Sequence, residues 1–304
     1  MNAKLAHPRY WLTWLVLGFG WLLAQLPYVV QRWLGNRLGD LFCLLRLKRL
    51  RIAERNIDAC FPELTETQRS RLVKEHMRAL GLGLFEMLIC WFGRKAAIVN
   101  RFEFVGEEHL TKYTDQGVLL LSLHFTNLEI CAPILGTRIP LIGIQRTHDN
   151  PIIEYLQSRG RIRYHPASGP HELMDRDDVR GMVKALRQKK TMLTFPDQDL
   201  GERRSVFAPF FGVQTATSIA PFKLAAAGRA KVLPVLFTRP SPSTYRIEIF
   251  PALENYPTGD DVADATRFNK LAEDFILDGP ERYLWVHRRF KTRPKGEPSL
   301  YKDL

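Results

Sequence analysis

The chain has few cysteines, and their spacing argues against a zinc site or a disulfide framework. Only four occur in 304 residues, Cys43, Cys60, Cys90 and Cys131, and none belongs to a C-x-x-C pair. All four lie among apolar neighbours, which is typical of small core residues in a reducing compartment. The motifs H-E-x-x-H, G-x-x-x-x-G-K-[ST] and G-x-G-x-x-G are absent as well. We therefore predict no metal site and no nucleotide cofactor.

Charged residues are missing from Tyr10 to Val30, a run of 21 residues. As a helix rising ~1.5 Å per residue, this run would reach roughly 31 Å, about the thickness of the hydrocarbon core of a bilayer. Residues 1–35 are thus predicted to form an N-terminal transmembrane or membrane-embedded helix; a re-entrant or interfacial helix and a buried core helix are the alternatives. A cleaved signal peptide is disfavoured because no A-x-A-like site follows.

Basic residues are concentrated after this segment, in the run LRLKRLRIAERN. The positive-inside bias therefore predicts that the rest of the chain lies in the cytoplasm, with this run against anionic lipid. The whole chain carries a net charge of +12, which implies an acidic partner such as an anionic membrane, a phosphorylated substrate or an acidic protein. Nucleic acid is a poor candidate because no recognition motif with interleaved aromatic residues accompanies the charge.

The remaining residues divide into two predicted regions. Residues 36–100 form a basic juxtamembrane helical region, in which Thr65 can cap a helix. Residues 101–304 alternate between strand-like runs and helical patterns, one of them from Val262 to Phe275. This alternation predicts an α/β fold with a mostly parallel mixed sheet flanked by helices. The strand-like runs are Val118–Leu123, Pro140–Gln145, Thr191–Phe195, Val232–Phe237 and Tyr245–Phe250.

A candidate catalytic pair follows the first of these strands. His124 comes where the strand ends, and Glu129 lies five residues further on. Ligands of open α/β sheets bind at the carboxyl ends of the strands. A carboxylate beside a histidine fixes its tautomer and stabilises the imidazolium, so that the ring can remove a proton from a hydroxyl. The alternative is a histidine that only satisfies a buried backbone group.

Two polar loops at later strand ends contain candidate substrate-binding residues. Arg146 could bind a phosphate or a developing oxyanion through its forked donors, or form a salt bridge to Asp149 or Glu154. Asp197 and Arg204 lie in a loop of mixed charge that could orient a basic residue and contact phosphate. A solvated loop with local ion pairs is the alternative for these two residues.

The C-terminal run RYLWVHRRFKTRPKGEP gathers further basic residues, among them His287, Arg288 and Arg289. This tail could bind a phosphorylated lipid or an acidic carrier protein through contacts that weaken with salt. A basic tail that simply lies beside an anionic membrane is the alternative.

Taken together, these blocks resemble a known enzyme family. HFTNLE resembles the H-x-x-x-x-D/E motif of glycerolipid-type acyltransferases, and FPDQDLGERRSVFAPFFG resembles their F-P-E-G-T-R-S block, with Asp197 at the position of its acid. CFPELTETQR, HFTNLE, IGIQRTHDNP, FPDQDLGERRSVFAPFFG and WVHRRFKTRPKGEPS stand in the order found in the lipid A late acyltransferases of Gram-negative lipopolysaccharide synthesis. The form of HFTNLE and QRTHDNP is more similar to the lauroyl type than to the myristoyl type.

The resemblance implies a glycerolipid-acyltransferase-like fold at the cytoplasmic side of the bacterial inner membrane. It implies transfer of a fatty acyl chain, expected to be lauroyl, from acyl carrier protein to a hydroxyacyl chain of the Kdo-bearing, bis-phosphorylated tetraacyl lipid A precursor. In this scheme His124 is the general base and Glu129 orients it, whereas Arg146, Asp197, Arg204 and His287–Arg289 bind substrate. Other interpretations are a glycerophosphate or lysophospholipid acyltransferase and a non-catalytic membrane lipid-binding module.

Overall fold

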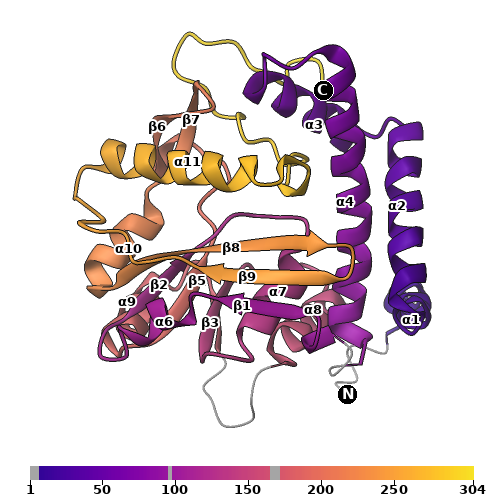
Figure 1. Ribbon diagram of the computed structural model, residues 1–304, viewed down its shortest axis with the longest axis horizontal. Coiled ribbons are helices and arrows are strands. Elements are labelled where there is room, and N and C mark those ends of the chain that lie inside the picture. Colours follow the sequence, from indigo (N-terminus) through magenta and orange to yellow (C-terminus); the bar gives the residue numbers. More distant parts are fainter. Residues whose placement is uncertain (1–6, 95–97, 165–171) are drawn as a thin grey trace.

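The computed structural model describes residues 7–94, 98–164 and 172–304, which build a seven-stranded mixed sheet between helices (Figure 1). The strand order is β1-β9-β8-β2-β5-β3-β4, and a separate hairpin is formed by β6 and β7. The strands are β1 (Phe102–Val105), β2 (Val118–Leu121), β3 (Leu141–Gln145), β4 (Glu172–Asp175), β5 (Thr191–Thr194), β6 (Ser205–Phe210), β7 (Val213–Ser218), β8 (Lys231–Ser241) and β9 (Thr244–Ile249).

The sheet confirms the predicted α/β fold. β8 and β9 pair antiparallel, whereas β1 with β9, β8 with β2, β2 with β5, β5 with β3 and β3 with β4 pair parallel. All four residues of β2 are buried, as expected of a central strand covered on both faces. The helices are α1 (Trp11–Ala24), α2 (Tyr28–Leu44), α3 (Lys48–Cys60), α4 (Glu66–Phe92), α6 (Glu107–Thr111), α7 (Leu128–Leu135), α8 (Pro151–Ile162), α9 (Val179–Arg187), α10 (Ala220–Gly228) and α11 (Asp261–Leu277).

The N-terminal segment differs from the single long helix predicted between Tyr10 and Val30. α1 ends at Ala24, and Pro27 occupies the N-cap position of α2 with extended backbone. Proline lacks the amide hydrogen that a continuous helix would need at this point. Among the described residues, no helix combines the length and the apolar character needed to cross a bilayer. The predicted transmembrane helix is therefore replaced by two shorter helices.

α2 packs against α4 through glycines, and Figure 1 shows the two helices side by side. A Cβ atom added to Gly81 would overlap the carbonyl oxygen of Gly35, and one added to Gly39 would overlap that of Met77. Glycine at these positions lets the two backbones touch. α4 also contacts the loop after His124, because a Cβ atom on Gly83 would overlap the carbonyl oxygen of Thr126. The predicted cap of α4 is confirmed: Thr65 forms a capping box with Gln68.

A buried ion pair joins α4 to the sheet. The side chain of Glu86 is fully buried and accepts hydrogen bonds from Arg239 of β8 and, at 2.6 Å, from the hydroxyl of Tyr245 of β9. The hydroxyl of Tyr28 on α2 lies 2.8 Å from that of Tyr245. One polar network thus connects α2, α4, β8 and β9.

Candidate active site

The carboxyl ends of two neighbouring strands bring a histidine and an aspartate together. β2 and β5 pair in parallel with Leu121 opposite Thr194, and the amide of Ser122 extends this pairing by donating to the carbonyl of Thr194 at 3.0 Å. His124 and Asp197 each lie three residues beyond that register. The strand pairing therefore places both side chains at the same edge of the sheet.

His124 and Asp197 make two hydrogen bonds. Nδ1 of the imidazole lies 2.7 Å from Oδ1 of Asp197, and the backbone amide of His124 donates to Oδ2 at 3.0 Å. Burial alone would raise the pKa of Asp197, which is 3% exposed, but the charge and hydrogen bonds of His124 outweigh burial and lower it. The acid is therefore a carboxylate at neutral pH, and Nδ1 carries the proton that it accepts. No described residue bonds Nε2, which is left to exchange a proton with a substrate.

The predicted pairing of His124 with Glu129 is wrong. α7 begins at Leu128, so Glu129 lies in its first turn and accepts a hydrogen bond at 2.6 Å from Arg161 of α8. The residue that orients the imidazole is Asp197, for which the sequence predicted substrate binding. Glu129 nevertheless lines the same cavity as His124.

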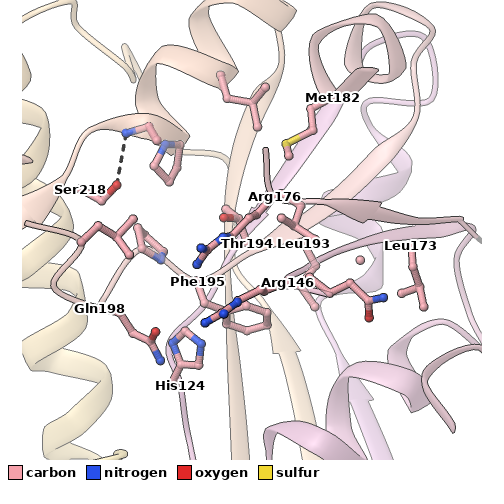
Figure 2. Close-up of a pocket in the computed structure, with 18 of the residues that line it drawn as sticks. His124, Arg146, Leu173, Arg176, Met182, Leu193, Thr194, Phe195, Gln198 and Ser218 are labelled. Carbon is pink, nitrogen blue, oxygen red and sulfur yellow. Dashed lines mark hydrogen bonds between the residues drawn. The ribbon is translucent and has the colours of Figure 1, made fainter. Parts of the chain in front are cut away.

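A cavity of about 1110 Å³ opens beside His124, and Figure 2 shows residues from several strand ends around it. The predicted candidates Arg146 and Arg204 both line it. Arg146 also lies 3.7 Å from Asp149, the salt-bridge partner considered from the sequence. Much of the wall is apolar and comes from α7, β4, β5, α9 and α10: Leu128, Ala132, Pro133, Leu173, Met182, Val183, Leu193 and Leu224. This cavity can hold an extended apolar chain next to the imidazole.

The C-terminal candidates lie outside this cavity, and the prediction that they bind substrate is wrong for Arg289. Its guanidinium is buried and donates to the carbonyl of Ala216 at 2.7 Å and to Thr217 at 3.2 Å, so it supports the β6–β7 hairpin. Arg288 lies over the ring of Tyr301 and donates to a carbonyl at the end of the chain.

The remaining C-terminal candidate, His287, supports the loop next to the active site. Burial lowers its pKa to about 4, so the ring is neutral at pH 7. Its Nε2 accepts a hydrogen bond at 3.3 Å from the amide of Asp199, two residues after Asp197. The carboxylate of Asp199 in turn accepts from the amide and the hydroxyl of Thr292 at 2.6 and 2.8 Å. The C-terminal segment thereby holds the loop that carries Asp197.

We expect two histidines, the buried His76 and the partly buried His287, to make the free energy of unfolding decrease as the pH falls. Burial lowers the pKa of both His287 and His76 to about 4, from an ordinary value of 6.5. The unfolded chain binds these protons at higher pH than the folded chain, so unfolding is favoured as pH falls below 6.5. Each histidine should lower the free energy of unfolding by about 2 kcal/mol when the pH changes from 7 to 5. Urea unfolding at the two pH values measures this difference.

His76→Gln and His287→Gln serve as controls for this prediction, and each should weaken the pH dependence by about half. His76 donates from Nδ1 to the carbonyl of Glu281 at 3.0 Å, a bond that a glutamine amide can replace. Equal unfolding free energies of the unmodified protein at pH 5 and pH 7 would contradict the assignment.

Comparison with known proteins identifies the family. Residues 1–292 match the family described as bacterial lipid A biosynthesis acyltransferase. The chain belongs to this family. It is 40% identical to the lipid A biosynthesis lauroyltransferase of Escherichia coli K12 over 304 residues, covering 99% of this chain and 98% of that protein. The chain is 39% identical to the lipid A biosynthesis palmitoleoyltransferase of the same strain, covering 99% of this chain and 97% of that protein. It is 28% identical to the myristoyltransferase of that strain, covering 99% of this chain and 93% of that protein.

The family membership gives the cavity and the histidine a chemical role. A lipid A biosynthesis acyltransferase moves an acyl group, and this chain is accordingly an acyltransferase. Sequence reasoning found His124 but missed Asp197 as its partner and Arg161 as the partner of Glu129. The equal offset of His124 and Asp197 from the ends of two apolar strands was the signal that could have found the first pair.

Proposed function

We propose that this acyltransferase transfers a fatty acyl chain, lauroyl by preference, from acyl carrier protein to a hydroxyl of the Kdo-bearing tetraacyl lipid A precursor. The observation that carries the proposal is the His124–Asp197 pair, whose imidazole lines a largely apolar cavity. The higher identity to the lauroyltransferase than to the myristoyltransferase supports the choice of chain. The net charge of +12 suits a donor carried by an acidic protein.

The proposed mechanism is direct transfer with His124 as general base. Nδ1–H donates to Asp197, so Nε2 removes the proton of the acceptor hydroxyl as its oxygen attacks the thioester carbonyl. The tetrahedral intermediate then expels the thiolate, which recovers the proton from the imidazolium. Asp197 stabilises the imidazolium throughout, because it is already ionised and hydrogen-bonded in the resting protein.

An acyl-enzyme intermediate is disfavoured by the nucleophiles near the site. Ser122 is 1% exposed and lies outside the cavity wall, as do the buried Cys90 and Cys131. Burial raises the pKa of both thiols. Ser218 lines the cavity, but its hydroxyl accepts a hydrogen bond from the amide of Ala220. Within the part of the chain that the structure describes, none of these groups is bonded to a histidine that could activate it.

The proposal is tested with purified protein, acylated carrier proteins of graded chain length and the tetraacyl precursor, followed by mass spectrometry. We expect the precursor to gain the mass of one acyl chain, fastest with the lauroyl donor. Acylation of lysophospholipid or glycerophosphate alone, with the precursor unchanged, would instead identify a glycerolipid acyltransferase. Binding of lipid without any transfer would identify a non-catalytic module.

We further propose that the protein binds the bacterial inner membrane on its cytoplasmic side through α1 and α2. These helices expose many large apolar side chains, and basic residues of α3 follow directly. An exposed apolar surface of this size beside basic residues is typical of binding to one leaflet of an anionic bilayer. The exposed side chains are Trp11, Leu12, Leu15, Val16, Phe19, Trp21, Leu22, Val29, Val30, Trp33, Leu41, Leu44 and Leu45.

Replacing Trp11, Phe19 and Trp33 with serine should release the protein from vesicles. Each side chain is more than half exposed. We expect the partition coefficient onto vesicles of phosphatidylethanolamine and phosphatidylglycerol to fall about tenfold for each side chain removed. Flotation measures this partition. The control is Val262→Ser with Leu277→Ser, two apolar residues of α11 that are also more than half exposed. Equal flotation of both variants would contradict the proposed surface.

A further inference from the structure

The cavity beside His124 carries an excess of positive charge that catalysis by His124 and Asp197 does not use. Six basic and three acidic side chains line it. Two of the basic groups are neutralised by close partners, since Arg161 bonds Glu129 at 2.6 Å and Lys223 bonds Asp261 at 2.7 Å. The other four include Arg146, Arg204 and Arg176.

These three arginines have no close carboxylate partner among the described residues. Arg146 lies 3.7 Å from Asp149, whereas Arg176 and Arg204 lie 3.9 and 3.8 Å from the same Asp177. Charge-assisted hydrogen bonds between guanidinium and carboxylate are shorter, about 2.7–2.9 Å. The N–H donors of the three guanidinium groups are thus available to a ligand with several acceptor oxygens.

The strand pairing fixes the position of two of these arginines. Gln145 and Asp175 are the last paired residues of β3 and β4, and Arg146 and Arg176 follow them directly. The amide of Arg176 donates to the carbonyl of Gln145 at 2.8 Å, which extends the ladder by one residue. Figure 2 shows both guanidinium groups extending toward the space beside His124. The pair is therefore held by backbone at the edge where α/β sheets bind their ligands.

We infer that Arg146, Arg176 and Arg204 form a site for a phosphate ester, which positions one of the two substrates over His124. Three guanidinium groups share only two long ion-pair partners, Asp149 and Asp177, so the cluster favours an additional anion. Tetrahedral phosphate offers oxygens that guanidinium forks bind in pairs. The inference rests on the proposed function, because the phosphate would belong either to the prosthetic arm of the acyl donor or to the lipid acceptor. Arg176 is the defining residue of the site and acts as a binding residue.

Binding of pyrophosphate to the purified protein, followed by calorimetry, tests the site without any acyl transfer. We expect Arg176→Gln to weaken binding about tenfold, the effect of losing one charged hydrogen-bonding partner, and Arg176→Lys to weaken it less. Arg180→Gln is the matched control, since Arg180 is exposed on α9 four residues away and outside the cavity wall. Equal loss of affinity in the Arg176 and Arg180 variants, or no loss in either, would overturn the site.

Kinetics then distinguish the two sources of phosphate. In Arg176→Gln we expect KM to rise about tenfold for one substrate with kcat little changed, because the lost contact binds ground state and transition state alike. The site belongs to the donor if the variant has a higher KM for acylated acyl carrier protein but an unchanged KM for an acyl-pantetheine donor that lacks phosphate. The site belongs to the lipid if the variant has a higher KM for the phosphorylated acceptor but an unchanged KM for a dephosphorylated acceptor. Unchanged KM for both substrates would overturn the inference, whereas pyrophosphate binding without transfer would contradict only the proposed function.

Discussion

Asp197→Asn should reduce kcat for acyl transfer by about 10²–10⁴-fold with little change in KM. Asp197 accepts hydrogen bonds from Nδ1 and the backbone amide of His124, so it fixes both the tautomer and the orientation of the ring. An asparagine amide can present its N–H to Nδ1, which would place the ring proton on Nε2 and leave no acceptor for the hydroxyl proton. Single-turnover rates with saturating donor and acceptor measure the effect. Full activity in this variant would exclude the proposed base.

Glu129 supplies the comparison for this prediction. Because Glu129 bonds Arg161 at 2.6 Å, Glu129→Gln and Arg161→Gln should share one defect, and the double variant should be no slower than the slower single variant. Neither should change the pH profile in the way Asp197→Asn does, since neither touches the imidazole. Non-additivity between Glu129→Gln and Asp197→Asn, with additivity between Glu129→Gln and Arg161→Gln, would restore Glu129 as the residue that orients His124.

Arg239→Met should lower the free energy of unfolding by about 3–5 kcal/mol, because it leaves Glu86 buried without a counter-charge. The side chain of Glu86 is fully buried, and that of Arg239 is 13% exposed. Tyr245 supplies one hydrogen bond to the carboxylate, but Oε2 of Glu86 has no partner among the described residues. Urea unfolding followed by circular dichroism measures the loss at neutral pH.

An exposed ion pair on the neighbouring strands is the matched control. Arg246 of β9 lies 3.1 Å from Glu103 of β1, with the two side chains 41% and 51% exposed. Arg246→Met should therefore change the unfolding free energy by no more than about 1 kcal/mol. The double variant Glu86→Met with Arg239→Met should recover most of the stability lost by Arg239→Met alone, since no buried charge remains. Similar losses for Arg239→Met and Arg246→Met would show that burial of the pair is unimportant.

The sequence predicted those parts of the fold that have a strong local pattern. The five apolar runs from Val118 to Phe250 correspond to strands of the sheet, and Thr65 caps α4 as predicted. β1 and β4 were missed because they are edge strands of only four residues, too short for a pattern to stand out from the neighbouring sequence. The break between α1 and α2 was underestimated, although Pro27 marks it.

Partners in the active site were harder to predict than the residues themselves. His124 was found because it ends an apolar strand, and Arg146 because it ends the next. Glu129 is close to His124 in sequence, but the first turn of α7 directs it to α8 instead. Asp197 is 73 residues away and reaches the imidazole only through the register of β2 with β5. Basic character likewise failed to separate Arg289, a buried structural residue, from Arg146.

The glycine contacts of α4 have a geometric consequence for the membrane binding proposed above. α4 touches α2 on one side, through Gly35 and Gly81, and the loop after His124 on the other, through Gly83, with no side chains between. Direct backbone contacts therefore connect the loop after His124, through α4, with the α2 helix that we propose to rest on lipid. If the protein binds lipid as proposed, the reacting nitrogen would stand at one set height above the headgroups, and the depth of the acceptor hydroxyl in the leaflet would matter as well as its shape.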